Sequence, residues 1–102
     1  MIARIWRGTT AASKAADYLA YLEATGIKDY RATPGNRGAQ VLRRATGDDV
    51  EFLLITLWDS LDAIRAFAGP DHERAVYYDE DRAYLRELTE FVEHFDVVAT
   101  TA

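Results

Sequence analysis

The most apolar stretch of the chain is Val50 to Trp58, VEFLLITLW, which holds one charged residue among nine. A short run that is rich in β-branched and aromatic residues predicts a strand buried on both faces. The residues TGDD at 46–49 are typical of a tight hairpin turn, so a second strand at Ala39–Ala45 should pair with it in the antiparallel direction. After the run, Asp59 or Ser60 can cap a helix whose apolar positions are Leu61, Ile64, Phe67 and Ala68 and which ends at Gly69-Pro70.

The same pattern predicts the remaining elements. Apolar residues in loose alternation predict a strand at Ile2–Arg7 that Gly8-Thr9-Thr10 breaks, and helical spacing predicts a helix over Ala11–Thr25 that ends at Gly26. Residues 27–38 carry Pro34-Gly35-Asn36 and predict a long polar loop. Beyond the helix that ends near Gly69, the sequence predicts a helical turn over Asp71–Tyr78, a helix from Asp79 through Leu88, and a last strand over Phe91–Thr100.

This order, β-α-β-β-α-(extra helices)-β, is a split βαβ pattern. It predicts an α+β, ferredoxin-like fold in which both main helices cover one face of a four-stranded antiparallel sheet. The length of 102 residues fits a single domain over residues 1–102.

The two faces of the third strand predict a homodimer. Leu53, Ile55 and Leu57 suit packing under the helices, which leaves Phe52, Leu54, Thr56 and Trp58 on the other face, beside Trp6. An open face of this kind would expose several hundred Å² of apolar surface, more than soluble monomers usually carry. A second copy packed sheet against sheet about a two-fold axis would cover it. The alternative is that one of the extra helices folds under the sheet.

Composition excludes several classes of function. The chain has no Cys, which rules out disulfides, thiolate catalysis and Cys-ligated metals. A net charge of −5 without a basic cluster argues against nucleic-acid partners. No signal peptide follows Met1, and no apolar run approaches the ~20 residues of a membrane span, so we expect a cytoplasmic protein without a membrane partner. His72 and His94 with scattered carboxylates make no recognisable metal site.

The element order, together with the turn ITLWDSLDAI at 55–64, resembles the antibiotic biosynthesis monooxygenase superfamily. The resemblance implies a dimeric α+β barrel. It also implies a division of function, because one branch comprises cofactor-independent monooxygenases that oxidise phenolic or anthrone-type compounds with O2, and another degrades haem. The haem-degrading branch uses an Asn on the first strand, a Trp at the end of the third, and a His on the next helix. Here Trp58 matches, but the other positions fall on Trp6 or Arg4 and on Tyr77, which disfavours haem degradation.

Four residues are candidates for chemistry, each with a structural alternative. Trp58 would form a pocket wall that stacks on an aromatic ring, or simply pack in the core. Tyr77, rather than its neighbour Tyr78, would hydrogen-bond a substrate phenol. His72 could act as a base or only cap a surface turn. Arg4 could hold a phenolate or carboxylate, or form a salt bridge with Glu51 or Glu93.

The pocket is expected between the sheet and the helices, with Trp6, Phe52 and Leu54 among its walls and Tyr30 reaching it from the long loop. His94 shares a strand face with Asp96, and an edge or dimer contact is the favoured role for that pair. These candidates lead to the hypothesis of a cofactor-independent monooxygenase that takes a small apolar or aromatic ligand and needs no cofactor. The alternative is a non-catalytic dimeric protein for small-molecule binding or stress response, and haem degradation is a minor third hypothesis.

Overall fold

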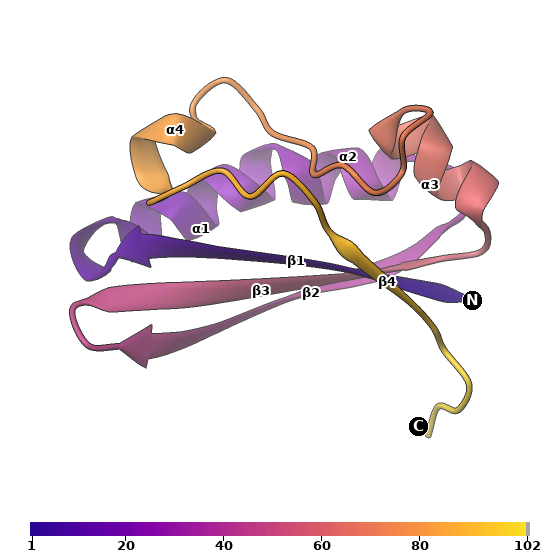
Figure 1. The fold of residues 1–102 in the computed structure, drawn as a ribbon, viewed down its shortest axis with the longest axis horizontal. Coiled ribbons are helices and arrows are strands. Elements are labelled where there is room, and N and C mark those ends of the chain that lie inside the picture. The colour runs from indigo at the N-terminus through magenta and orange to yellow at the C-terminus, as the bar shows by residue number, and fades with distance from the viewer. Residues whose placement is uncertain (102) are drawn as a thin grey trace.

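The computed structural model describes residues 1–101, which form a four-stranded antiparallel sheet with its helices on one face (Figure 1). The strands are β1 (Ile2–Ala11), β2 (Asn36–Thr46), β3 (Asp49–Trp58) and β4 (Glu93–Asp96), and the sheet order is β2-β3-β1-β4. The helices are η1 (Ala12–Lys14), α1 (Ala15–Ala24), α2 (Gly26–Ala32), α3 (Leu61–Ala68) and α4 (Asp81–Tyr84). The predicted α+β, ferredoxin-like fold is confirmed.

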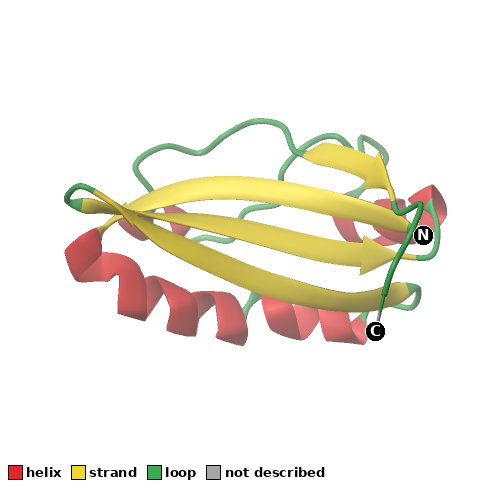
Figure 2. Ribbon diagram, turned by 90° about the horizontal axis from the view of Figure 1, so that it is seen from below, coloured by secondary structure: helices red, strands yellow, loops and turns green. Residues whose placement is uncertain are grey.

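The face assignment of β3 is wrong, and the structure reverses it. Phe52, Leu54 and Trp58 point toward the helices and are at most 5% exposed, whereas Leu53 and Ile55 lie half-buried on the other face. Both faces of this strand are apolar, so the alternation of residues alone does not predict which face packs against the helices. Figure 2 looks onto the face that no helix covers.

β1 is longer than predicted, because Gly8 does not break the strand. All ten of its residues pair with β3, from Ile2 opposite Trp58 to Ala11 opposite Asp49. Gly8 is needed for space: a Cβ there would lie 2.2 Å from Cη2 of Trp6, whose ring covers the glycine. The residue that looks like a breaker in the sequence therefore makes room for a core side chain.

Four other predictions are corrected. Residues 27–38 are not one loop, since α2 occupies Gly26–Ala32 directly after a bend at Thr25. Residues 71–78 form no helix, and the helix expected through Leu88 shrinks to the single turn of α4. The last strand keeps only four residues, Glu93–Asp96, which pair with the first part of β1.

Residues 69–80, between α3 and α4, form a segment that we call the strap. It has no regular secondary structure and crosses the helix-bearing side of the sheet (Figure 1). Of the two predicted caps, Asp59 and Ser60, it is Ser60 that caps α3 before the strap, because its hydroxyl accepts a hydrogen bond from the Ala63 N–H at 3.1 Å. No helix among residues 1–101 has the length and apolarity to cross a membrane.

Candidate functional site

The side chains between the sheet, α1, α2 and the strap enclose a small aromatic cavity. It is lined from the sheet by Arg4, Trp6 and Leu54, from α1 and α2 by Tyr18 and Tyr30, from the strap by Tyr77 and Tyr78, and from α4 by Asp81. Its volume is about 30 Å³, which is room for one or two water molecules. The cavity therefore has an aromatic wall with one cation and one carboxylate set into it.

Arg4 is a buried cation to which the described part of the chain offers no carboxylate partner. It is 5% exposed, and none of the ion pairs formed by residues 1–101 involves it. Its guanidinium donates to the backbone carbonyl of Arg74 at 2.7 Å and to that of His72. Burial lowers the pKa of Arg4, although an arginine this basic stays charged at neutral pH. The predicted alternative, a salt bridge to Glu51 or Glu93, is not formed.

Two imidazoles lie beside this guanidinium. Nε2 of His94 is 3.2 Å from a terminal nitrogen of Arg4, and the rings of His94 and His72 meet edge to face at 5.1 Å. Burial, together with the charge of Arg4, lowers the pKa of His94 to about 4. His94 is therefore neutral at pH 7 and presents a lone pair to the cation. Among residues 1–101 no three His, Asp or Glu side chains converge as metal ligands.

Tyr77 is fixed by three polar contacts. Its hydroxyl accepts from the indole N–H of Trp6 at 3.1 Å, donates to the Thr89 carbonyl at 2.6 Å, and lies 3.0 Å from the Thr89 hydroxyl. The Trp6 and Tyr77 rings also meet edge to face at 6.3 Å. This network holds the strap on β1 and sets the orientation of the Trp6 ring.

Tyr30 projects from α2 into the cavity, and Trp58 lies behind it. The Trp58 ring is fully buried against Tyr30 and Phe67, and its N–H donates to the Thr56 hydroxyl at 2.8 Å. Burial raises the pKa of Tyr30 to about 12, with the charge of Arg4 acting in the opposite direction. The Tyr30 phenol is therefore neutral at pH 7 and can donate a hydrogen bond to a ligand.

The carboxylate of the cavity, Asp81, was not predicted from the sequence. It is 4% exposed, and its Oδ2 accepts from the backbone N–H of Tyr78 at 2.6 Å. An Asp at a helix start is usually an exposed cap, and nothing local in the sequence marks this one as buried. Tyr18, 1% exposed, was also passed over, although it lies three residues after Ala15 at helical spacing.

The structure brings five of the predicted site residues to the cavity wall: Arg4, Trp6, Tyr30, Leu54 and Tyr77. Three others lie elsewhere. Trp58 and Phe52 are fully buried one layer behind the wall, and Phe52 packs edge to face on Tyr18 at 5.1 Å. The His72 ring meets the His94 ring edge to face outside the wall, so His72 contributes to the site only through its backbone carbonyl, which accepts from Arg4.

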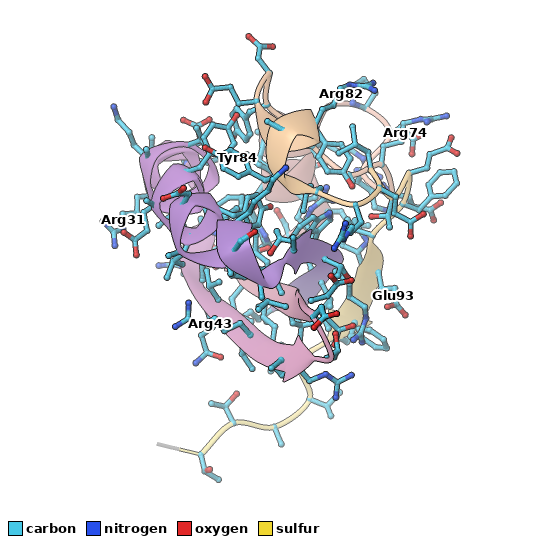
Figure 3. The ribbon with its side chains drawn as sticks, turned by 90° about the vertical axis from the view of Figure 1, so that its left-hand side faces the viewer. Arg31, Arg43, Arg74, Arg82, Tyr84 and Glu93 are labelled. Carbon is cyan, nitrogen blue, oxygen red and sulfur yellow. The ribbon has the colours of Figure 1, made fainter. Side chains whose placement is uncertain are left out.

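The outer surface of the strap is charged rather than aromatic. Arg74 points away from the sheet (Figure 3) and pairs with Asp71 at 3.0 Å and with Glu90 at 2.7 Å. Its side chain also lies over the Phe91 ring, with the guanidinium carbon 5.5 Å from the ring centroid. The strap therefore directs its tyrosine side chains toward the cavity and its charged side chains away from it.

A family model described as "Antibiotic biosynthesis monooxygenase" matches residues 1–79. No curated protein sequence matches the chain.

Among solved structures, SnoaB, a cofactor-independent oxygenase from Streptomyces nogalater, is 21% identical with a TM-score of 0.66 and covers 97% of this chain and 94% of its own. The heme-degrader MhuD from Mycobacterium tuberculosis, with two hemes bound in its active site, is 21% identical with a TM-score of 0.62 and covers 100% of both chains. A putative antibiotic biosynthesis monooxygenase from Bacillus cereus is 16% identical with a TM-score of 0.66 and covers 100% of this chain and 95% of its own. At these identities the likeness is one of fold.

Proposed function

The chain belongs to the antibiotic biosynthesis monooxygenase family, and from this we propose that it is a cofactor-independent monooxygenase that oxidises a phenolic or related aromatic molecule with O2. The observation that carries the proposal is Arg4, a buried guanidinium that lies at the wall of an aromatic cavity and has no carboxylate partner among residues 1–101. Burying an unpaired charge costs several kcal/mol. A site that binds an anion formed during its reaction gives this cation a function.

The reaction balances without a cofactor when the substrate supplies the electrons. Loss of a proton turns the substrate into an electron-rich anion, which passes one electron to O2 and then couples with the superoxide to form a peroxide. Loss of water from the peroxide leaves a new carbonyl. In sum, the substrate loses two hydrogens, from a ring CH2 of an anthrone or from the O–H and one ring C–H of a phenol. With O2 they give one new C=O and H2O, so one oxygen atom enters the product and the other leaves as water.

In this proposal the described residues bind and orient the substrate. Arg4 stabilises the anion, Tyr30 donates a hydrogen bond, and the rings of Trp6 and Tyr77 pack against the aromatic substrate. Trp58 contributes indirectly, by fixing the ring of Tyr30 from behind. An aromatic ring needs more room than about 30 Å³, so the strap moves outward when the substrate enters.

Oxygen consumption with a panel of substituted hydroquinones and anthrones tests the proposal. We expect turnover by the wild type and a loss of about 100-fold in kcat for Arg4→Met, the order found when one anion-stabilising donor is removed. Arg7→Met is the matched control, because Arg7 is on the same strand, exposed, on the opposite face of the sheet. Trp58→Phe and Tyr77→Phe should give intermediate losses.

Two results would contradict the proposal. The first is no oxygen uptake with any compound of the panel, and if such compounds still bind, the protein is a binding module. The second is an equal loss for Arg4→Met and Arg7→Met. A haem titration belongs in the same series, because MhuD is a heme-degrader of the same fold. A Soret shift at stoichiometric haem would favour that activity instead.

We also propose that the protein is a homodimer through its sheet faces. With the faces of β3 reversed, the open side carries Leu53, Ile55 and Leu57 half-buried at its centre, with Leu42 and Phe95 about half exposed on the flanking strands. The ion pairs Arg44–Glu51 and Arg7–Glu93 lie at the margin of this face. An apolar centre with a charged rim is the usual composition of a protein interface.

Sedimentation equilibrium tests the dimer. The wild type should sediment as a dimer at micromolar concentration, and Ile55→Glu should convert it to a folded monomer, because it puts an unpaired charge at the centre of the interface. Glu80→Lys, on the helix-bearing side, is the control and should leave the dimer intact. A monomeric wild type would overturn the proposal.

A further inference from the structure

One cavity group has no part in the proposed function, the carboxylate of Asp81. It is 4% exposed, and none of the ion pairs of residues 1–101 includes it. Its Oδ2 accepts a hydrogen bond from the Tyr78 N–H, so Oδ1 is the oxygen that remains to accept from a ligand in the cavity that Asp81 lines. A structural need for the Tyr78 contact alone would be met equally well by the uncharged amide of an Asn, so the charge itself calls for an explanation.

The titratable groups that face Asp81 are the phenols of four tyrosines, which belong to three different elements. Tyr18 and Tyr21 come from α1, Tyr30 from α2 and Tyr78 from the strap, and the charge of Asp81 raises the pKa of all four. Tyr78 already donates to Asp29 at 2.6 Å, and Tyr21 accepts from the Glu80 N–H at 3.1 Å. Within residues 1–101 the hydroxyls of Tyr18 and Tyr30 form no hydrogen bond, so both are available to a ligand next to Asp81.

Burial makes this carboxylate a better base than a surface aspartate. Desolvation raises the pKa of Asp81, and only the Tyr78 N–H opposes it. A base with a raised pKa lies closer to a phenol in proton affinity, which lowers the cost of taking the phenol's proton. Arg4 reduces that cost further, because it lines the same cavity and stabilises the negative charge that remains on the substrate.

We propose that Asp81 is the proton acceptor of this site and that its substrate is a phenol or hydroquinone whose hydroxyl is bound next to Oδ1. The inference rests on the proposed function for the oxidation that comes after the proton transfer. In the step itself the substrate O–H bond breaks, its electron pair stays on the phenolate oxygen, and the proton bonds to Oδ1. In a hydroquinone the second oxygen accepts from Arg4, and in a simple phenol the guanidinium stabilises the delocalised charge of the phenolate. Asp81 lies just beyond residues 1–79, the part of the chain that the family model matches.

Ligand binding tests the assignment without any turnover. The probes are 4-methylphenol and its methyl ether, 4-methylanisole, which differ only in whether the oxygen carries a proton to donate. We expect the wild type to bind the phenol at least about tenfold more tightly than the ether, the order expected for a hydrogen bond to a charged acceptor. In Asp81→Asn the amide nitrogen at the Oδ1 position cannot accept a hydrogen bond, so the ratio of the two dissociation constants, ether over phenol, should fall to about one. Isothermal titration calorimetry measures this ratio for the wild type and for the variant.

Asp79→Asn is the matched control, because Asp79 is an exposed carboxylate two residues away, and it should keep the wild-type ratio. The inference is overturned if Asp81→Asn keeps the preference for the phenol, or if the wild type has none. Should Asp81→Asn fail to fold, the wild type carries the test alone. Its preference should vanish as the pH falls through the pKa of Asp81, since a protonated carboxyl donates to the ether, and a constant ratio would overturn the inference.

Turnover separates the two proposals. If the wild type oxidises hydroquinones and Asp81→Asn loses about 100-fold in kcat with little change in KM, Asp81 acts in the proton transfer. Equal kcat values for the two would overturn its role even if binding changed. If the wild type consumes no oxygen but the phenol preference still depends on Asp81, the monooxygenase proposal fails and the assignment of Asp81 as hydroxyl acceptor stands.

Discussion

Replacing Gly8 with Ala should destabilise the protein through the Trp6 ring. The added Cβ would lie 2.2 Å from Cη2 of Trp6 and 2.5 Å from Cζ2, both about 1 Å or more inside ordinary contact distance. Neither group can yield freely, because Gly8 is in the middle of a strand paired along its whole length and the Trp6 indole is hydrogen-bonded to Tyr77. The Trp6 ring must therefore shift and strain or break that bond.

The expected cost has two parts. Overpacking in a well-filled core costs about 1–3 kcal/mol, and loss of the Trp6–Tyr77 hydrogen bond adds about 1 kcal/mol. Urea denaturation should show a lower midpoint at unchanged slope, with a stability loss of about 2–4 kcal/mol. In the background Trp6→Phe, which lacks the two clashing atoms, the same change at Gly8 should cost much less.

Gly26→Ala is the natural control. A Cβ at Gly26 would lie 3.5 Å from the Tyr30 hydroxyl, an ordinary contact, and the residue is helical, so Ala should be neutral or stabilising by up to ~1 kcal/mol. The reasoning is refuted if Gly8→Ala costs less than ~0.5 kcal/mol. It is also refuted if Gly8→Ala costs the same with Trp6 and with Phe at position 6.

Three further predictions concern the strap and the ring beside Arg4. Tyr77→Phe should cost ~1–3 kcal/mol in urea denaturation, because it leaves the Thr89 carbonyl without its donor. Tyr78→Phe removes the 2.6 Å bond to Asp29 and should speed amide hydrogen exchange in residues 69–80. The His94 ring should titrate near pH 4 by NMR rather than near 6.5. The pKa of His94 is lower in the folded state than in the unfolded chain, so protonation favours unfolding. The contribution of the neutral ring to the free energy of unfolding is therefore complete above about pH 6.5 and is lost as the pH falls toward 4.

Each of these three predictions can be contradicted by a specific result. Tyr84→Phe, which changes a phenol that packs on Tyr18 and Tyr21 outside the cavity wall, is the control for both tyrosine variants (Figure 3). If it costs as much as Tyr77→Phe or loosens the strap as much as Tyr78→Phe, the hydrogen bonds are not responsible. An NMR midpoint for His94 near 6.5 would mean that its surroundings do not disfavour the charged ring.

Local patterns in the sequence predict the fold well because each main element has its own signal. The apolar run at 50–58, the hairpin turn before it and the Ser60 cap after it all lie where the structure has them. The faces of β3 could not be predicted, since large apolar side chains alternate on both sides. α2 was missed because Pro34 and Gly35 look like part of a loop, whereas the helix ends just before them at Ala32.

The site residues could be predicted only on strands, where the alternation of side chains determines which residues share a face. Arg4 and Trp6 share a face of β1, so once one reaches the cavity the other does as well. Trp58 is on the corresponding face of β3, but the packing of Tyr30 and Phe67 in front of it removes it from the wall. Asp81 could not be predicted in this way, because its burial at the cavity wall beside Tyr18 and Tyr30 results from tertiary packing.

The outer edge of the sheet has a consequence for how the protein behaves in solution. β2 is eleven residues long and has a partner on one side only, so its free backbone N–H and C=O groups could pair with another chain. A bulge between Asn36 and Gly38 interrupts its regular spacing, and Arg37, Arg43 and Arg44 place three cations along it. The bulge and these charged side chains, of which Arg37 pairs with Asp59 and Arg44 with Glu51, discourage growth of the sheet into fibres and leave the broad face as the route to self-association.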